Sequence, residues 1–550
     1  MAFFVNPIFS DNMVLQRDKA VRIWGCADKT DSAHELHLSF DSPSRNSFTL
    51  KTTIRADGSW SFTLPPHTAG TSGVLSISDG CNTIRFQNVI FGDVWFAGGQ
   101  SNMELELQNS QGGKTELQNC ANSNIRFYLS VKRVVVDADF IAEEKASSWQ
   151  CAASDTAAAL SAVAYYFART IERDTHVPIG IINCSWGGTS ISAWMSEAQL
   201  RKSAAGLRYI TDYTALEGGK TDAEYQEAMR LYMDELAAYN ARAESAKQKN
   251  PAITPTELNA QCGAYPWPQP AGKNSPFKPC NQYNARITRI APYTIKGFLY
   301  YQGEEDETRA GDYADMMYYL IDQWRSDWHD DLLPFLFVQL PMWAGADEYA
   351  NNTMTDDWCV LRECQHKVSR TIANTALACI IDCGEFDNIH PTDKETVGYR
   401  LALLALEKLY ANESAQPRPA QHFQPAAHGR AAIPSDRVCS ANSWQHGCCD
   451  APYPDSFTII EEDGSVRVNY ATPLCSRTKD GEPCDLTGFE LSGDGTVFYP
   501  AVSVMSAEGV LLRSPKVASP CAVRYAWRKW GDCPLYSKSG LPAFPFRVRL

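Results

Sequence analysis

The stretch that decides the fold is Gly92-Asp93-Val94-Trp95-Phe96-Ala97-Gly98-Gly99-Gln100-Ser101-Asn102-Met103. Its apolar run, residues 94–97, predicts a short buried strand that the following glycines end. Ser101 therefore lies at the carboxyl end of that strand, just before an expected helix. Ligands of open α/β sheets bind at this edge, where a helix N-terminus also favours a developing oxyanion. Ser101 is either a nucleophile or an ordinary N-cap serine, and this stretch alone leaves both interpretations open.

Strand and helix patterns alternate on the C-terminal side of this stretch. The expected buried strands are residues 94–97, 179–184, 295–301, 335–340 and 376–381, and the expected helices are residues 156–173, 313–328 and 393–410. Such alternation predicts an α/β fold with a mainly parallel, doubly wound sheet.

The chain divides into three expected domains. Residues 1–91 form an N-terminal β-rich domain of the β-sandwich type, with strands at 21–25, 35–40 and 59–64 and a hairpin turn at Ala56-Asp57-Gly58. Residues 92–412 form the α/β domain, and residues 413–550 form a second β-rich domain that packs back on the core.

An insertion at about residues 200–282 interrupts the α/β domain. It contains a long amphipathic helix at 223–247, followed by a Pro-rich loop at 251–279. This helix is either a lid or substrate wall beside the site or, as the more ordinary interpretation, a solvated packing helix.

The bulk properties exclude several function classes. The chain has 550 residues, which exceeds the usual size of one core, and a net charge of −14, which argues against nucleic acid or an anionic membrane as partner. No run approaches the roughly 20 apolar residues of a membrane span. The N-terminus lacks a basic n-region and a long apolar segment, so we expect a cytoplasmic protein, or a secreted one if a leader has been removed.

Cysteine usage fits the same compartment. The 18 cysteines include no C-x-x-C pair and are expected to be mostly buried free thiols, Cys184, Cys379 and Cys383 among them. In a secreted protein, Cys448-Cys449 and Cys475 with Cys484 would be disulfide candidates. No set of His, Cys and carboxylate residues has the spacing of a metal site, so neither a metal nor another cofactor is expected.

Four segments at the ends of predicted strands supply chemistry: Ser101, Gly187-Gly188, Gln302 and Asp387-Asn388-Ile389-His390. Serine acyl transfer needs a base in contact with the hydroxyl and an acid that orients the base. Asp387 can fix the Nδ1–H tautomer of His390 while Nε2 faces Ser101. The backbone N–H of Ser101, an N–H near Gly188 and the Gln302 side chain can form an oxyanion hole. Each piece alone is common, and the specificity lies in the ordered set.

This ordered set resembles the SGNH hydrolase superfamily, and specifically the sialate O-acetylesterase family. The similar segments are Met13-Val14-Leu15-Gln16-Arg17, Gly98 to Met103, Trp186 to Thr189 with Trp194, Tyr301 to Glu304, Trp324-Arg325, Leu333 to Leu340, His390-Pro391 with Lys394, Gly398 and Arg400 to Ala402, Arg524 to Trp527, and Gly540 to Arg547. The resemblance implies a Ser–His–Asp acetylesterase. The G-x-S-x-G elbow of α/β-hydrolases is absent.

By this resemblance Ser101 is the nucleophile, His390 the base and Asp387 the orienting acid, and Ser101, Gly188 and Gln302 donate to the oxyanion. The expected substrate is an O-acetylated sugar, sialic acid first. The alternatives are acetylated xylan-type oligosaccharides and, in another class, an inactive carbohydrate-binding protein. A sialate carboxylate would favour Arg or Lys at the mouth. Glu305-Asp306, which replace the family's usual Ser-Asn, and the acidic net charge weigh against it.

Overall fold

The computed structural model describes residues 2–28, 34–43, 46–411, 450–460 and 464–550. Two disulfide candidates of the sequence analysis, Cys448 and Cys449, lie outside these residues. The chain forms two compact units. Unit 1 comprises Met1–Tyr225, Ala271–Glu305 and Asp315–Leu336, and unit 2 comprises Gln226–Pro270, Asp306–Ala314 and Phe337–Leu550.

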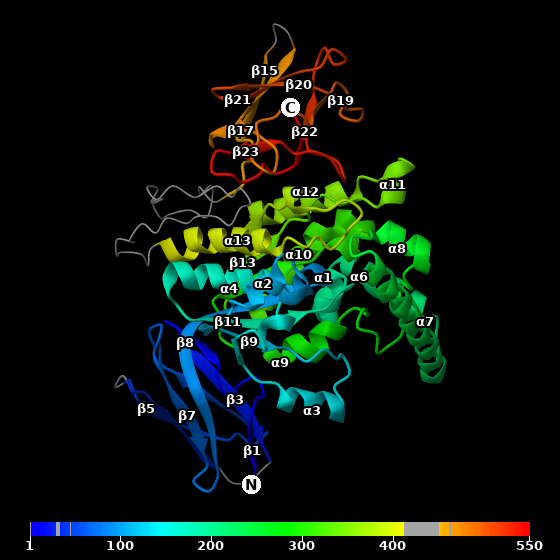
Figure 1. Cartoon of the computed structure of the whole chain (residues 1–550). Helices are drawn as coiled ribbons and strands as arrows, with labels where there is room; N and C mark the ends of the chain where they lie inside the picture. Colours follow the sequence, from blue (N-terminus) through cyan, green and yellow to red (C-terminus); the bar gives the residue numbers. More distant parts are fainter. Residues whose placement is uncertain (1, 29–33, 44–45, 412–449, 461–463) are drawn as a thin grey trace. The chain divides into compact units, whose positions relative to one another are not determined.

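A single long strand, β8 (Thr83–Gly99), organises unit 1. Its first part pairs with β7 (Ser72–Ser78) and β2 (Val14–Gln16). From Asp93 onward it pairs in parallel with β11 (Ile179–Ser185) and β12 (Gly297–Tyr301). Figure 1 shows this strand running from the N-terminal sheets into the central sheet. The domain boundary expected between residues 91 and 92 therefore falls inside one strand.

The central sheet of unit 1 is mainly parallel, as the alternation of elements predicts. Its order is β10 (Gln150–Ala152), β9 (Asn122–Leu129), β11, β8, β12, and β10 is the antiparallel edge strand. The next expected strand, β13 (Phe335–Val338), lies at the boundary of the units. The Phe298 amide donates to the Pro334 carbonyl at 2.8 Å, immediately before β13 begins. These findings confirm a mixed α/β fold with a large sheet.

Helix α4 (Ala162–Thr175) packs against β9 and β11. It begins six residues later than the sequence pattern suggests, because the Ser161 hydroxyl caps it by accepting from the Ala164 amide at 3.2 Å. The other α-helices that lie wholly or mostly in unit 1 are α1 (Ser101–Glu104), α2 (Gly113–Leu117), α3 (Ala138–Ala146), α5 (Glu197–Leu200), α6 (Ala204–Glu217), α9 (Thr288–Ile290) and α10 (Tyr313–Asp327).

The N-terminal part of unit 1 contains two groups of strands. One sheet has the order β1 (Phe3–Val5), β3 (Val21–Ala27), β6 (Ser59–Leu64), and the other strands pair in the order β5 (Phe48–Thr53), β4 (Glu35–Asp41), β7, β8. The hairpin expected at Ala56-Asp57-Gly58 is wrong. That turn connects β5, which pairs with β4, to β6, which pairs with β3, so it carries the chain from one sheet to the other.

A buried carboxylate lies at the point along β8 where the strand changes from its first set of pairing partners to its second. Asp93 has no exposed surface. Its oxygens accept from Arg17 Nε at 3.0 Å, Arg17 Nη2 at 2.9 Å and Gln16 Nε2 at 2.8 Å. Gln16 also accepts from the Val94 amide at 2.9 Å. The Gln16-Arg17 pair therefore holds β2 and β8 together at this junction.

Removing Arg17 should cost much more than removing an exposed arginine, because it leaves the Asp93 carboxylate buried without its main partner. For Arg17→Ala we expect a loss of about 3–5 kcal/mol in the stability of unit 1, measured as a fall in thermal midpoint. The matched control is Arg201→Ala, whose partner Glu197 is exposed, and it should leave the midpoint nearly unchanged. Equal shifts for the two variants would contradict this role of Asp93.

Unit 2 contains the end of the α/β part and the C-terminal strands. Its helices include α11 (Ala346–Ala350), α12 (Asp357–Thr371) and α13 (Lys394–Ala405). The amide of Gln339, which directly follows β13, donates to the carbonyl of Ala378 at the end of β14 (Thr375–Ala378) at 3.0 Å. The C-terminal strands form three sheets. The first has the order β15 (Ser456–Ile460), β16 (Ser465–Asn469), β21 (Gly509–Arg513), β20 (Val502–Ser506), and the second has the order β19 (Tyr499–Pro500), β18 (Phe489–Ser492), β22 (Ala522–Tyr525), β24 (Phe546–Arg549). The third is the pair β17 (Leu474–Ser476) and β23 (Leu535–Ser537).

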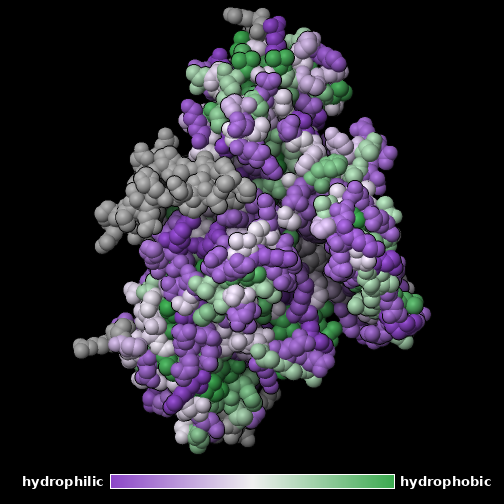
Figure 2. Space-filling model, in the orientation of Figure 1, coloured by the Kyte–Doolittle hydropathy of each residue, from purple (hydrophilic) through white to green (hydrophobic). Residues whose placement is uncertain are grey.

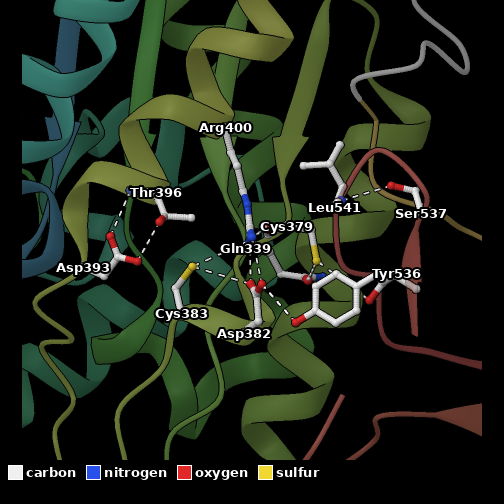
Figure 3. Close-up of polar contacts among 12 residues, drawn as sticks. Gln339, Cys379, Asp382, Cys383, Asp393, Thr396, Arg400, Tyr536, Ser537 and Leu541 are labelled. Carbon is white, nitrogen blue, oxygen red and sulfur yellow. Dashed lines mark hydrogen bonds and ion pairs between the residues drawn. The ribbon is translucent and has the colours of Figure 1, made fainter. Parts of the chain in front are cut away.

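A buried ion pair connects α13 to these C-terminal strands within unit 2. Arg400 donates from Nη1 and Nη2 to the two oxygens of Asp382 at 2.5 and 2.8 Å, and the Tyr536 hydroxyl donates to Asp382 at 3.2 Å. Figure 3 shows the guanidinium and the carboxylate pointing toward one another, with Tyr536 beside them. Burial alone would raise the pKa of the Asp382 carboxyl, but Arg400 outweighs it and the pKa lies below its ordinary value. The C-terminal strands are thus part of the packed core of unit 2.

The insertion is more helical than expected. Its long helix is confirmed as α7 (Asp222–Lys249), and Figure 2 shows mainly hydrophilic residues on the viewed face of that region. The expected Pro-rich loop at 251–279 is partly wrong, because it contains α8 (Pro255–Cys262). Helix α8 packs on α7 through a small core of Tyr239, Ala243, Ala246 and Cys262.

Other expectations concern thiols, metals and membranes. Cys184, Cys379 and Cys383 are buried free thiols, and Cys475 and Cys484 are also free. Across the described ranges, His, Cys, Asp and Glu side chains form no group of three or more that could hold a metal ion. The helices in those ranges include none with the length and apolar character of a membrane span.

Candidate active site

Three of the predicted site segments follow the same edge of the central sheet in unit 1. In the parallel register Gly99 lies opposite both Ser185 and Tyr301. The residues that follow, Ser101, Gly188 and Gln302, therefore leave adjacent strand ends. Two backbone hydrogen bonds continue the pairing beyond the strands: the Trp186 amide donates to Gly99 and the Gln100 amide donates to Tyr301, both at 3.0 Å.

Glycine is required where these segments approach one another. Gly99 has φ +135°, and a Cβ there would lie 2.1 Å from the Tyr301 carbonyl oxygen. A Cβ on Gly187 would lie 3.2 Å from the Cβ of Ser101, which is tighter than most Cβ contacts in proteins. The Gly187-Gly188 turn therefore lies directly against Ser101, where the backbone N–H of Gly188 can approach a ligand.

Ser101 is the first residue of α1, and the N-cap position belongs to Gln100. The N-cap interpretation of Ser101 is therefore wrong. The Gln100 side chain makes no cap hydrogen bond, and its Oε1 instead accepts from the Gly303 amide at 3.2 Å and from Gln302 Nε2 at 3.1 Å. Gln100 thus fixes the loop after β12 against the loop that carries the serine.

Gln302 is nearly fully buried among these loops, with 1% of its surface exposed. Its amide nitrogen donates to Gln100 Oε1 at 3.1 Å and to the Thr189 carbonyl at 3.2 Å. The same side chain therefore bridges all three strand ends. An oxyanion bound by this amide would have to replace one of the two hydrogen bonds.

Charged and aromatic side chains surround the serine loop. Glu104 accepts from the Gly187 amide and forms an ion pair with Lys132, an exposed residue whose Nζ lies 5.3 Å from the ring centre of Trp186. Asn102, which has no exposed surface, donates to Glu304. An indole ring with a lysine next to it thus lies beside the serine loop.

The histidine segment belongs to unit 2 and forms a tight turn between η6 (Ile381–Cys383) and α13. Glu385 holds this turn by accepting from Asn388 Nδ2 at 2.7 Å, from the Thr392 amide at 2.6 Å and from the Thr392 hydroxyl at 2.7 Å. Asp393 caps α13 by accepting from the Thr396 amide at 3.0 Å. His390 is exposed on this turn, and its amide donates to Asn388 Oδ1 at 3.0 Å.

Asp387 is fixed by the insertion and by α11. Its carboxylate accepts from the Thr256 amide at 2.8 Å, the Thr256 hydroxyl at 2.7 Å and the Ala346 amide at 3.0 Å. These three hydrogen bonds hold the carboxylate from two segments of unit 2, the start of α8 and the start of α11. The amide of Thr256 is available for this role because the first N–H groups of a helix have no partner within the helix.

Sequence reasoning did not find Thr256, Ala346 or Glu385. A signal for the first was present: Thr254-Pro255-Thr256-Glu257 has the Ser/Thr-x-x-Glu spacing of a capping box with proline at the first helical position. The structure contains that capping box, in which the Thr254 amide donates to Glu257 at 3.0 Å and the Glu257 amide donates back to the Thr254 hydroxyl at 3.2 Å.

The mixed α/β fold brings a serine, a glycine turn and a buried glutamine to one sheet edge, an arrangement that suits a serine hydrolase. Comparison with known proteins gives the family. The chain matches the family described as carbohydrate esterase, sialic acid-specific acetylesterase, over residues 91–248 and 271–407, and belongs to it.

The relatives agree with this assignment. Sialate O-acetylesterase of Mus musculus is 26% identical over 85% of this chain and 79% of its own length. Sialate O-acetylesterase of Homo sapiens is 24% identical over 84% of this chain and 76% of its own length. A crystal structure of a carbohydrate acetylesterase from Xanthomonas citri aligns with a TM-score of 0.70 and 26% identity, covering 100% of this chain and 99% of that one. The protein is therefore an esterase of a family that deacetylates carbohydrates.

The contact between Thr256 and Asp387 can be tested without an activity assay. Thr256→Val keeps the backbone donor but removes the hydroxyl that donates to the carboxylate, and a hydrogen bond to a charged group is worth about 1.5–3 kcal/mol. We expect hydrogen exchange at residues 385–392 to be at least about tenfold faster, whereas Thr256→Ser should restore protection. Thr211→Val, which removes a hydroxyl bonded only within α6, is the matched control. Unchanged exchange in Thr256→Val would contradict the role of this hydroxyl.

Proposed function

We propose that the protein is an SGNH-type serine esterase that removes O-acetyl groups from sialic acid by a Ser–His–Asp mechanism. The observation that carries the proposal is the common sheet edge at which Ser101, Gly188 and Gln302 follow three neighbouring parallel strands. The roles of His390 and Asp387 rest on the resemblance of the D-x-x-H segment to the family motif.

In the proposed reaction Ser101 Oγ attacks the acetyl carbonyl carbon while His390 Nε2 takes the hydroxyl proton. The tetrahedral intermediate collapses when the bond to the sugar oxygen breaks and His390 protonates that oxygen, which leaves as the free sugar hydroxyl. A water molecule then attacks the acetyl-enzyme with His390 again as base, and acetate leaves as Ser101 recovers its proton. Asp387 orients the imidazole.

The negative charge of the intermediate would be stabilised by the backbone N–H groups of Ser101 and Gly188. The Gln302 amide is the third donor, and binding of the oxyanion replaces its hydrogen bond to Gln100 or Thr189. Loss of one such donor costs about 3 kcal/mol of transition-state stabilisation in other serine hydrolases.

The nucleophile is tested first, with 4-nitrophenyl acetate and then with O-acetylated sialic acid. Ser101→Ala should lower kcat by at least about a thousandfold on both esters, because the covalent route is lost. The matched control is Ser110→Ala, which removes a nearby hydroxyl that donates to the Leu107 carbonyl. Wild-type rates in Ser101→Ala would place the nucleophile elsewhere. A wild-type protein that binds sugars but cleaves neither ester would contradict the mechanism as a whole.

Sialate as the substrate is supported by Lys132 as well as by the names of the relatives. Lys132 is an exposed cation beside Trp186. It forms an ion pair with Glu104, which lies on the helix that begins at Ser101. A sialic acid differs from a neutral sugar by its carboxylate, which an ammonium group at the mouth would attract.

Lys132→Gln should therefore raise KM for O-acetylated sialic acid by about fivefold and change the KM for acetylated xylo-oligosaccharides much less. The measurement is the ratio of kcat/KM for the two substrates, with Lys114→Gln, an exposed lysine of α2, as control. If wild type prefers the xylo-oligosaccharide and Lys132→Gln leaves the ratio unchanged, the sialate assignment is wrong.

A further inference from the structure

Three aromatic side chains of unit 2 form a partly exposed cluster next to the histidine segment. Phe386 and Tyr349 are 42% and 49% exposed, and their rings meet edge to face with centroids 5.4 Å apart. Trp530, from the C-terminal part of the chain, lies 5.5 Å from Phe386 at an interplanar angle of 57°. We call Tyr349, Phe386 and Trp530 the aromatic platform.

The platform is held by a buried cation. Only 2% of the Lys529 side chain is exposed, and its ammonium group pairs with Glu307 at 2.8 Å and with Glu348 at 2.9 Å. Burial alone would lower the pKa of Lys529, but the two carboxylates raise it, so the lysine remains charged. Because Lys529 precedes Trp530 and Glu348 precedes Tyr349, this ion pair holds together the two chain segments that carry these rings.

The third ring is fixed by the carboxylate of the proposed triad. Phe386 directly precedes Asp387, whose amide donates to Ala344 at 3.1 Å and whose carboxylate accepts from Ala346, the first residue of the helix that carries Tyr349. The same hydrogen bonds therefore position Asp387 and place Phe386 against Tyr349. A ligand on the platform lies beside the segment that ends in His390.

Two carboxylates and a paired lysine lie on the segments that carry Tyr349 and Trp530. Helix α11 carries Asp347 and Glu348, and the nearby Lys529 is buried and shared by two carboxylates. These groups disfavour an anion on the rings. Exposed aromatic rings that border a polar site are typical of ligand-binding surfaces, and they suit the apolar face of a sugar ring.

We propose that the aromatic platform is a subsite for a neutral sugar ring of the substrate, contributed in part by the loop between β22 and β23. The inference rests on the proposed function and extends it: the enzyme recognises an acetylated oligosaccharide rather than only the acetylated monosaccharide. In this subsite the neutral ring packs against Phe386 and Trp530, whose ring planes are inclined at 57° to one another.

The test compares an O-acetylated sialyl-oligosaccharide, the free O-acetylated sialic acid and 4-nitrophenyl acetate. Trp530→Ala and Tyr349→Ala should raise KM for the oligosaccharide by about tenfold, relative to the other two esters, with little change in kcat. Phe386→Trp should preserve the oligosaccharide preference that Phe386→Ala loses. Tyr318→Ala removes a 53% exposed ring that contacts Tyr319 on α10, and it is the matched control.

Calorimetric binding of the deacetylated oligosaccharide gives a second readout that needs no catalysis. Weaker binding by the platform variants supports the subsite even if the nucleophile has been assigned wrongly. Equal losses on all three esters would show that the rings only support the fold. No loss on any of them, with unchanged binding, would overturn the subsite and leave the rings as a surface for another partner. An inactive wild type would contradict the proposed function and not the subsite.

Discussion

The parallel register of β8 with β11 and β12 is the constraint on which the serine half of the site depends. Hydrogen bonding in a parallel ladder fixes which residues lie opposite each other, and here Gly99 faces Ser185 and Tyr301. A shift by one residue would move Ser101 away from the glycine turn and turn alternate side chains to the other face. The Gln16-Arg17 contact with Asp93 holds β8 at the start of this register.

The histidine half depends on a different kind of interaction. There two carboxylates fix a short turn. Glu385 accepts hydrogen bonds from donors within the turn, and Asp387 accepts them from α8 and α11. Hydrogen bonds to ionised acceptors are stronger than neutral ones, so a few of them can order a segment that has no regular structure. The insertion therefore has a function in unit 2: the start of α8 positions Asp387.

The C-terminal strands are likewise more than an appended domain. Tyr536 donates to Asp382 of the buried ion pair with Arg400, and Lys529 pairs with Glu307 and Glu348. Charges removed from water are tolerated only when they are paired and hydrogen-bonded, so these contacts tie the strands to the helices of unit 2. The contact of Lys529 with its two carboxylates also holds the segments that carry Trp530 and Tyr349 of the aromatic platform.

The sequence by itself determined the strand–helix alternation and the position of Ser101 at a strand end, because apolar periodicity and glycine pairs are local signals. The family came from the resemblance of its ordered motifs, which the family match over residues 91–248 and 271–407 confirms. The sequence also predicted the strands at 179–184 and 335–340 nearly to the residue. It did not predict that β8 continues through the expected domain boundary, that the turn at Gly58 connects two sheets, or that Thr256 bonds Asp387 from 131 positions away. Only the tertiary structure decided these, since strand partners and hydrogen-bond acceptors far apart in the chain are chosen by packing and leave no local pattern.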